Sequence, residues 1–280
     1  QVGSGIETSI AERRKRNKKT HSFMKRTLLN TTLYLVAFVA IQVLITLVIG
    51  VIAPIFGQKS DSGLMLVISS ATAGLLTLIL FFCAKFTPKG TEYVRSRPWG
   101  TLAWCSLAAL GATIPSLALQ ELMPALPDTM SDTLMKIVHV PGGYFVLAIM
   151  APLSEEAVFR GAILRELQKA ISNKWMAICI SAVIFALIHV NPAQMPHAFL
   201  MGLLLGWLYA KTNSILPGVV FHTANNTIAY LMAVRFPDPD MKLSDIFAGN
   251  TTSMILAILF SLCIFIPAIW NIYKDKGRCH

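Results

Sequence analysis

The sequence predicts an all-α, polytopic membrane protein with about eight transmembrane helices around a polar cavity. Of its 280 residues, 55% are hydrophobic and only 14% are charged, and the mean hydropathy is +0.61. Apolar runs of about 18 or more residues, long enough to cross a bilayer, recur along the chain. No long polar stretch remains to build a water-soluble domain, so residues 28–273 are predicted to form a single membrane domain.

The two ends of the chain are polar and basic. Residues 1–27 carry eight Lys and Arg residues, too many for a bilayer core, and are predicted to form a cytoplasmic N-terminal arm. Residues 274–280 are predicted to form a cytoplasmic tail. The net charge of +10 lies mostly beside apolar segments, where it indicates topology and contact with membrane lipids. No nucleic-acid partner is therefore expected.

The first three spans are predicted at residues 28–56, 64–86 and 99–123. Trp99 opens the third span, as an aromatic residue suited to the membrane interface, and Pro115 is expected to kink it. The loop that follows is interrupted by Pro124, Pro127, Pro141 and Gly142–Gly143. These residues break regular structure, so no regular element is expected in this loop.

The remaining segments are predicted at residues 144–170, 174–190, 197–210, 214–233 and 252–273. Pro152 lies in the fourth, where a kink would free backbone groups. The sixth, at 14 residues, is short for a full crossing. Its Gly202 and Gly206 are spaced four apart, a pattern that lets helices approach closely.

The distribution of basic residues predicts the orientation. When the loops alternate from a cytoplasmic start, 19 of the 24 Lys and Arg residues lie inside, and Arg160 lies within the fourth segment. The four on the other side are Lys59, Lys136, Arg235 and Lys242. This asymmetry predicts eight spans with both termini cytoplasmic, in a bacterial inner (plasma) membrane or in an endoplasmic-reticulum-type membrane of a eukaryote.

The fourth segment carries charged residues inside an apolar run, at Glu155, Glu156 and Arg160. Such residues usually face a polar cavity and pair with one another, so they indicate a functional site. Glu156 and Arg160 are one helical turn apart and can pair directly, whereas Glu155 is rotated by about 100° and remains available. The alternative is that all three form a salt-bridge network that only locks helices together.

Other polar side chains lie on the fifth and seventh segments. His189 ends the fifth, and Phe185, one turn earlier, is a candidate to wall the cavity and fix the imidazole. His222 and Asn226 share one helix face as a pair of donors, suited to a developing oxyanion, while Asn225 points away by about 100° in a supporting role. The alternative for each of these side chains is a structural role, in core packing or in hydrogen bonding between helices.

The two histidines are predicted to lie at different depths in the membrane. On straight, upright helices His189 and His222 would differ in height by roughly 10 Å, so segments near Pro192 and Pro217 would have to be tilted or re-entrant to bring them level. The five cysteines, including Cys279 in the tail, show no Cys-x-x-Cys spacing, so neither a disulfide framework nor a thiolate metal site is expected. No cofactor is predicted.

Three motifs, in order, resemble those of the CAAX protease and bacteriocin-processing (CPBP) family of intramembrane glutamic endopeptidases, also called the ABI family. They are Glu155-Glu156-x-x-x-Arg160, Phe185-x-x-x-His189 and His222-x-x-x-Asn226. Each motif alone is weak, but all three in this order on three hydrophobic segments are specific. The resemblance covers about residues 140–235, the expected catalytic core, and implies an eight-helix architecture and peptide-bond hydrolysis within the membrane.

The resemblance also implies a role for each residue. Glu155 would be the general base that activates water, and His189 would position or polarise that water. His222 and Asn226 would form the oxyanion hole. Glu156 and Arg160 would be the ion pair that orients Glu155.

Two other functions are compatible with these residues. A zinc protease could use Glu155, His189 and His222 as ligands, although the sequence has no His-Glu-x-x-His motif. A non-catalytic immunity, scaffold or transport protein could line a conduit or binding site with the same polar cluster. For an enzyme, the expected partners are membrane lipids and a peptide or lipidated-peptide substrate, including CAAX-type peptides, and the sequence leaves the oligomeric state open.

Overall fold

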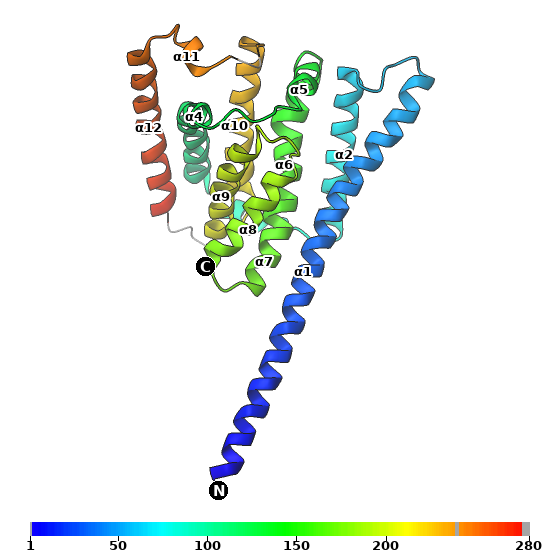
Figure 1. The fold of residues 1–280 in the computed structure, drawn as a ribbon, viewed down its shortest axis with the longest axis vertical. Helices are drawn as coiled ribbons and strands as arrows, with labels where there is room; N and C mark the ends of the chain where they lie inside the picture. The colour runs from blue at the N-terminus through cyan, green and yellow to red at the C-terminus, as the bar shows by residue number, and fades with distance from the viewer. Residues whose placement is uncertain (1, 239–240, 276–280) are drawn as a thin grey trace.

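The computed structural model describes residues 2–238 and 241–275, with side chains from residue 22 onward, and it is helical in every regular element of those residues (Figure 1). Residues 276–280 of the predicted tail, with Cys279, lie outside the described residues. The side chains of the basic residues between Arg13 and Lys19 lie outside them too.

Each of the eight predicted segments is helical. The first three are α1 (Val2–Ile55), α2 (Gly63–Cys83) and α4 (Trp99–Glu121), with the short α3 (Thr91–Arg95) between the last two. The fourth is a continuous rod made of η1 (Phe145–Met150), α6 (Ala151–Glu156), η2 (Ala157–Leu164) and α7 (Arg165–Ala170). The others are α8 (Lys174–Leu187), α9 (Met195–Thr212), α10 (Leu216–Arg235) and α12 (Thr251–Lys274), with the short α11 (Leu243–Ile246) before α12.

Four of the described helices are long and apolar enough to cross a membrane: residues Ser22–Ile55 of α1, then α2, α4 and α12. Many of their apolar side chains are exposed, as expected for helices that face lipid. The helices between residues 145 and 235 do not combine sufficient length with sufficient apolar character, and α8 has only 14 residues. They form the interior of the bundle, between α1 and α2 on one side and α4 and α12 on the other (Figure 1).

The prediction of no regular element in the loop after the third span was wrong, because α5 (Ser131–Val138) forms there. Pro127 and Pro141 lie on either side of this helix instead of within it. The Asp128 carboxylate accepts the backbone N–H groups of Met130 and Ser131 and so satisfies donors at the start of the helix. The buried Ile137 and Val138 then anchor one face of α5 to the bundle.

The predicted sixth segment was too short. α9 has 18 residues, because Pro196 occupies the first turn of the helix, where its missing N–H is tolerated. α1 is also longer than the predicted first span, since the helix extends back through the basic arm to Val2. α3 and α11, each of one turn, were not predicted.

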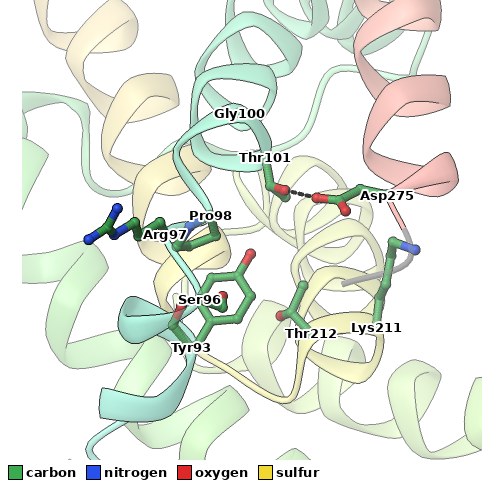
Figure 2. Close-up of a pocket in the computed structure, with 9 residues that line it drawn as sticks. All are labelled: Tyr93, Ser96, Arg97, Pro98, Gly100, Thr101, Lys211, Thr212 and Asp275. Atoms are coloured by element: carbon green, nitrogen blue, oxygen red, sulfur yellow. Dashed lines mark hydrogen bonds between the residues drawn. The ribbon is translucent and has the colours of Figure 1, made fainter. Parts of the chain in front are cut away.

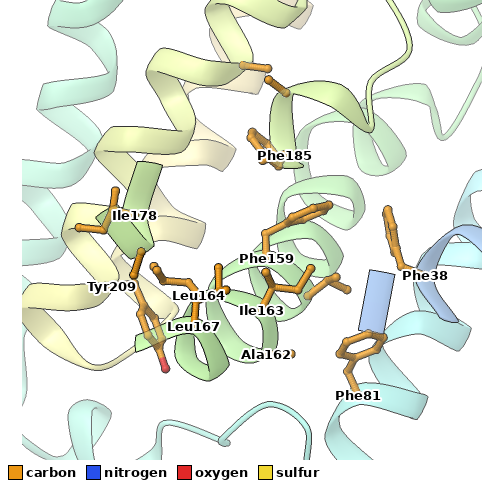
Figure 3. Close-up of a cluster of buried hydrophobic side chains, with 14 residues drawn as sticks. Phe38, Phe81, Phe159, Ala162, Ile163, Leu164, Leu167, Ile178, Phe185 and Tyr209 are labelled. Carbon is orange, nitrogen blue, oxygen red and sulfur yellow. The ribbon is translucent and has the colours of Figure 1, made fainter. Parts of the chain in front are cut away.

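The largest buried cluster joins the rod to its neighbours (Figure 3). Phe38 of α1, Phe81 of α2, Phe159 of η2 and Phe185 of α8 contribute aromatic rings, and the Phe159 ring meets both Phe38 and Phe185 edge-on, at 5.7 and 5.1 Å between centroids. Such edge-to-face pairs add to the stabilisation from apolar burial. The cluster therefore holds the rod in the middle of the bundle.

The two ends of the bundle differ. The N-terminus and the end of α12 lie at one end, called here the terminal end (Figure 1). α5, α11 and the connection between α1 and α2 lie at the other, called here the α5 end.

The predicted close approach at Gly202 and Gly206 is present between α9 and α8. A Cβ atom at Gly202 would lie 2.8 Å from the Cα atom of Ala182, and one at Gly206 would lie 2.9 Å from Cγ2 of Ile178. Gly202 therefore touches backbone, which cannot move aside as a flexible side chain can.

Gly202→Val is expected to destabilise the protein by about 1–3 kcal/mol, because the added side chain must push α8 and α9 apart. The measurement is the thermal unfolding midpoint of the protein purified in detergent. Gly50→Val is the matched control, because nothing lies within 4 Å of a Cβ atom at that position. Equal midpoints for the two variants would contradict the packing described for Gly202.

Candidate active site

The rod that carries the acidic residues is wound as a π-helix on both sides of α6. Pro152 supplies no N–H group and its ring crowds the preceding turn, which favours a wider turn upstream. Downstream, the carbonyl oxygen of Ala157 accepts the Thr87 hydroxyl at 2.6 Å, and that of Phe159 accepts the Ser181 hydroxyl at 3.2 Å. These hydroxyls occupy carbonyl groups of the helix ladder and so accommodate the looser winding of η2.

Glu156 and Arg160 form the predicted ion pair within this rod. Arg160 Nη1 donates to Glu156 Oε1 at 2.9 Å, and both side chains are fully buried. Arg160 Nη2 also donates to the carbonyl oxygen of Gly202 at 3.4 Å, and the guanidinium lies 4.3 Å from the centroid of the Phe185 ring. One arginine therefore connects the rod to α8 and α9.

Glu155 is directed away from that pair. Its side chain is 21% exposed, and Oε2 lies 3.8 Å from His222 Nε2. The other imidazole nitrogen, His222 Nδ1, lies 3.2 Å from Glu156 Oε1, so it donates its proton to that carboxylate. His222 thus lies between the two adjacent glutamates, one of which is bound to Arg160 while the other lines a cavity.

The protonation of His189 follows from its hydrogen bond to the backbone. Its Nδ1 lies 2.8 Å from the carbonyl oxygen of Phe185, and a carbonyl oxygen can only accept, so Nδ1 carries the proton. In the neutral imidazole, Nε2 then holds a lone pair. The Phe185 ring also meets the His189 ring edge-on at 4.9 Å between centroids. Phe185 therefore lines the cavity and contacts the imidazole through both its ring and its backbone carbonyl.

Asn226 bridges α10 and the rod, since its Nδ2 donates to the carbonyl oxygen of Leu147 at 3.0 Å. The amide retains a second N–H group.

The prediction that Asn225 points away from the site was wrong. This residue lines the same cavity, and its Nδ2 donates to Asn226 Oδ1 at 3.3 Å, because successive residues near a concave wall can both reach it.

These side chains meet in a cavity of about 320 Å³. Its wall includes Glu155, Phe185, His189, His222, Asn225 and Asn226. Glu156 and Arg160 are not part of this wall, but Glu156 contacts His222 and Arg160 contacts Phe185. His189 and His222 line the same cavity although straight helices would place them at different heights. α8 ends at Leu187, and His189 lies in the turn beyond it.

Three polar residues of the cavity were not predicted: Gln194, His197 and Tyr230. His197 Nδ1 lies 2.8 Å from the hydroxyl of Ser116 on α4, so one ring nitrogen of this third imidazole is already hydrogen-bonded. The available signal was a histidine at the start of an apolar segment, directly after the turn that follows His189. Among the residues described, no group of three or more His, Cys, Asp or Glu side chains is placed to hold a metal ion.

A second pocket, of about 390 Å³, lies at the terminal end between α3, α4, α9 and the end of α12 (Figure 2). The Thr101 hydroxyl donates to Asp275 there, and Lys211 Nζ donates to the carbonyl oxygen of Tyr273 at 2.9 Å. The Arg97 and Lys211 side chains point to opposite sides (Figure 2). None of the predicted site residues lines this pocket.

Arg160→Met is expected to destabilise the protein by about 3–5 kcal/mol, because it leaves the buried Glu156 carboxylate without its positive partner. The measurement is the thermal midpoint in detergent. Lys136→Met is the control: it breaks the Lys136–Asp61 pair, whose side chains are 47% and 70% exposed, and should leave the midpoint near that of the wild type. A wild-type midpoint for Arg160→Met would contradict the structural role of the pair.

Comparison with known proteins gives the following relatives. A family model described as "Type II CAAX prenyl endopeptidase Rce1-like" matches residues 138–228. The chain is 32% identical over 134 residues to the UPF0177 protein YxdF of Lactococcus lactis subsp. lactis (strain IL1403), covering 47% of this chain and 72% of that protein. It is 27% identical over 157 residues to the membrane-embedded CAAX protease MroQ of Staphylococcus aureus (strain USA300), covering 53% and 62%. No solved structure matches the chain.

The segment matched by the family model contains every residue of the three motifs, from Glu155 to Asn226. It also contains the π-wound rod and the part of α10 that faces it. The chain therefore belongs to the CAAX protease and bacteriocin-processing (CPBP) family of membrane proteases.

Proposed function

We propose that this protein is an intramembrane endopeptidase in which Glu155 activates a water molecule to hydrolyse a peptide bond. The observation that carries the proposal is the separation of two adjacent carboxylates. Glu156 is fully buried and bound to Arg160, whereas Glu155 lines the cavity beside His222. A carboxylate that is not neutralised by an arginine is free to accept a proton from water.

In the proposed reaction, Glu155 takes a proton from water and the resulting hydroxide attacks the peptide carbonyl carbon. The water is held by Glu155 and by Nε2 of His189, which can accept a hydrogen bond because Nδ1 is bonded to Phe185. The proton on Glu155 then passes to the leaving amine as the carbon–nitrogen bond breaks. No covalent enzyme intermediate is formed.

The negative charge that develops on the carbonyl oxygen is stabilised by His222 and Asn226. Asn226 offers its second N–H group, because the first is bonded to Leu147. Arg160 pairs with Glu156 in the same low-dielectric surroundings. His222 then donates from Nδ1 to Glu156 and from Nε2 to the oxyanion.

The architecture proposed with this activity is the eight-helix crossing with both termini in the cytoplasm. α9, at 18 residues, is about 27 Å long, which approaches the thickness of the hydrocarbon core. The proposed substrates are membrane-associated peptides, and the likeness to type II CAAX prenyl endopeptidases and to the CAAX protease MroQ makes CAAX-type peptides one class to test.

Glu155→Gln is expected to lower peptide hydrolysis at least about 100-fold, because the amide cannot accept the proton from water. The measurement is cleavage of a peptide library, prenylated members included, by the protein purified in detergent with a strong chelator present throughout. The wild type should remain active under these conditions. Glu92→Gln, an exposed glutamate on α3, is the matched control and should cleave like the wild type.

Two results would contradict this mechanism. Equal cleavage by Glu155→Gln and wild type would remove Glu155 as the base. Loss of wild-type activity in the chelator, with recovery on adding zinc, would favour metal chemistry instead.

Asn226→Ala is expected to lower kcat about 100- to 1,000-fold with a smaller effect on KM, because its donor acts on the oxyanion more than on the bound substrate. Steady-state kinetics on the best library peptide measure both constants. Asn271→Ala on α12 is the control, since that amide bonds only to the Pro267 carbonyl among the contacts described. A change confined to KM, or to the thermal midpoint, would assign Asn226 to binding or structure.

A further inference from the structure

The catalytic cavity opens toward one end of the bundle. The rod, α8 and α9 line it with the parts nearest the α5 end, and α10 lines it along most of its length. α8 contributes only Phe185 and the turn residue His189 beyond it, and the α9 contacts come from its first turns and the residue before them, Gln194 to Met201. α10 lines it from His222 to Ala233, a distance of about 16 Å along the helix axis.

The mouth of the cavity is apolar. At the α5 end, Leu134 and Val138 of α5 and Ala229 and Ala233 of α10 line it. Tyr230 also lines the mouth, but its hydroxyl donates to the carbonyl oxygen of Val138 at 3.0 Å, so that polar group is already satisfied. A peptide that enters here meets apolar walls before it reaches Glu155.

The opposite direction is closed by packed side chains. All eight residues of η2, from Ala157 to Leu164, are buried, and they follow directly after the two glutamates toward the terminal end. Phe159, Ile163 and Leu164 belong to the large buried cluster that joins α1, α2, α8 and α9 (Figure 3). A peptide approaching from the terminal end would have to displace this core.

The charges of the chain indicate which face of the membrane the open end meets. Basic residues are concentrated at the terminal end, whereas the connections at the α5 end carry only Lys59, Lys136, Arg235 and Lys242. The same connections carry several acidic residues, among them Asp61, Asp128, Asp132 and Asp245. By the positive-inside rule, the α5 end lies outside the cytoplasm.

We infer that the substrate is a peptide presented at the extracytoplasmic face of the membrane, with apolar residues flanking the scissile bond. The hydrolysis itself rests on the proposed function, whereas the direction of the opening does not. The cavity at the α5 end accepts the apolar flank between α5 and α10, and this places the scissile bond beside Glu155. The buried η2 segment and its cluster separate the terminal end from the same carboxylate.

Cysteine labelling tests the direction of access without requiring catalysis. In a background with all five native cysteines replaced, and with its thermal midpoint verified, Ala233→Cys places one thiol at the cavity mouth. Ser96→Cys, exposed and in the pocket at the terminal end, is the matched control. A membrane-impermeant maleimide is applied to spheroplasts and to inverted membrane vesicles of a bacterial host. Ala229→Cys replaces Ala233→Cys if the latter does not accumulate.

The expected result is labelling of the mouth thiol in spheroplasts only and of the Ser96→Cys thiol in inverted vesicles only. Labelling of the mouth thiol in vesicles, in both preparations or in neither overturns the inference. Because the labelling does not depend on hydrolysis, an inactive wild type would defeat the proposed function and leave the direction of access standing.

A second arm tests the substrate class. A quenched fluorescent peptide with apolar residues around its central bond is added to spheroplasts and to inverted vesicles that contain wild type or Glu155→Gln. Hydrolysis by wild type in spheroplasts alone, and absent in the variant, is expected. Hydrolysis in vesicles alone, or in neither preparation, overturns the assignment of an apolar extracytoplasmic peptide even where the labelling is as expected.

Discussion

The structure depends on one buried ion pair, Glu156 with Arg160, in the middle of an apolar bundle. Two charges removed from water are stabilised when they face each other and when their remaining polar atoms find partners. Arg160 finds partners in Glu156, the Gly202 carbonyl and the face of the Phe185 ring, while its Nε and Oε2 of Glu156 have no hydrogen-bond partner among the described residues. Because these partners come from three helices, the pair sets the position of the rod against α8 and α9, and the site is built on that contact.

The winding of the rod determines what the neighbouring carboxylate can do. Glu155 and Glu156 are adjacent in sequence, yet one is fully buried and the other borders a cavity. α6 presents them in different directions, and the π-helical turns that follow it, in η2, are supported by hydroxyl groups from Thr87 and Ser181 on other segments. π-helical turns are rare in proteins and are found frequently at functional sites.

Hydrolysis within a membrane requires water where the surroundings exclude it. The polar residues of this cavity lie on one side of the buried aromatic and aliphatic cluster, so water can reach Glu155 without passing through the core. The same apolar surroundings strengthen each hydrogen bond and each charge interaction at the site. An activity of this kind therefore needs the packed cluster as much as it needs the polar residues.

The sequence alone determined the helical class, the eight helical segments, the Glu156–Arg160 pair and the close approach at Gly202, because hydropathy, i,i+4 spacing and small residues act locally along a helix. It also supplied the motif residues on the fourth, fifth and seventh segments. It missed α5, where prolines flank a helix whose start is bonded by the Asp128 carboxylate, and it missed His197, whose neighbourhood exists only after folding. Only the tertiary structure decided that Asn225 and His197 line one cavity with the motif residues, because this depends on how separate helices pack, and such contacts leave no periodic signal in the sequence.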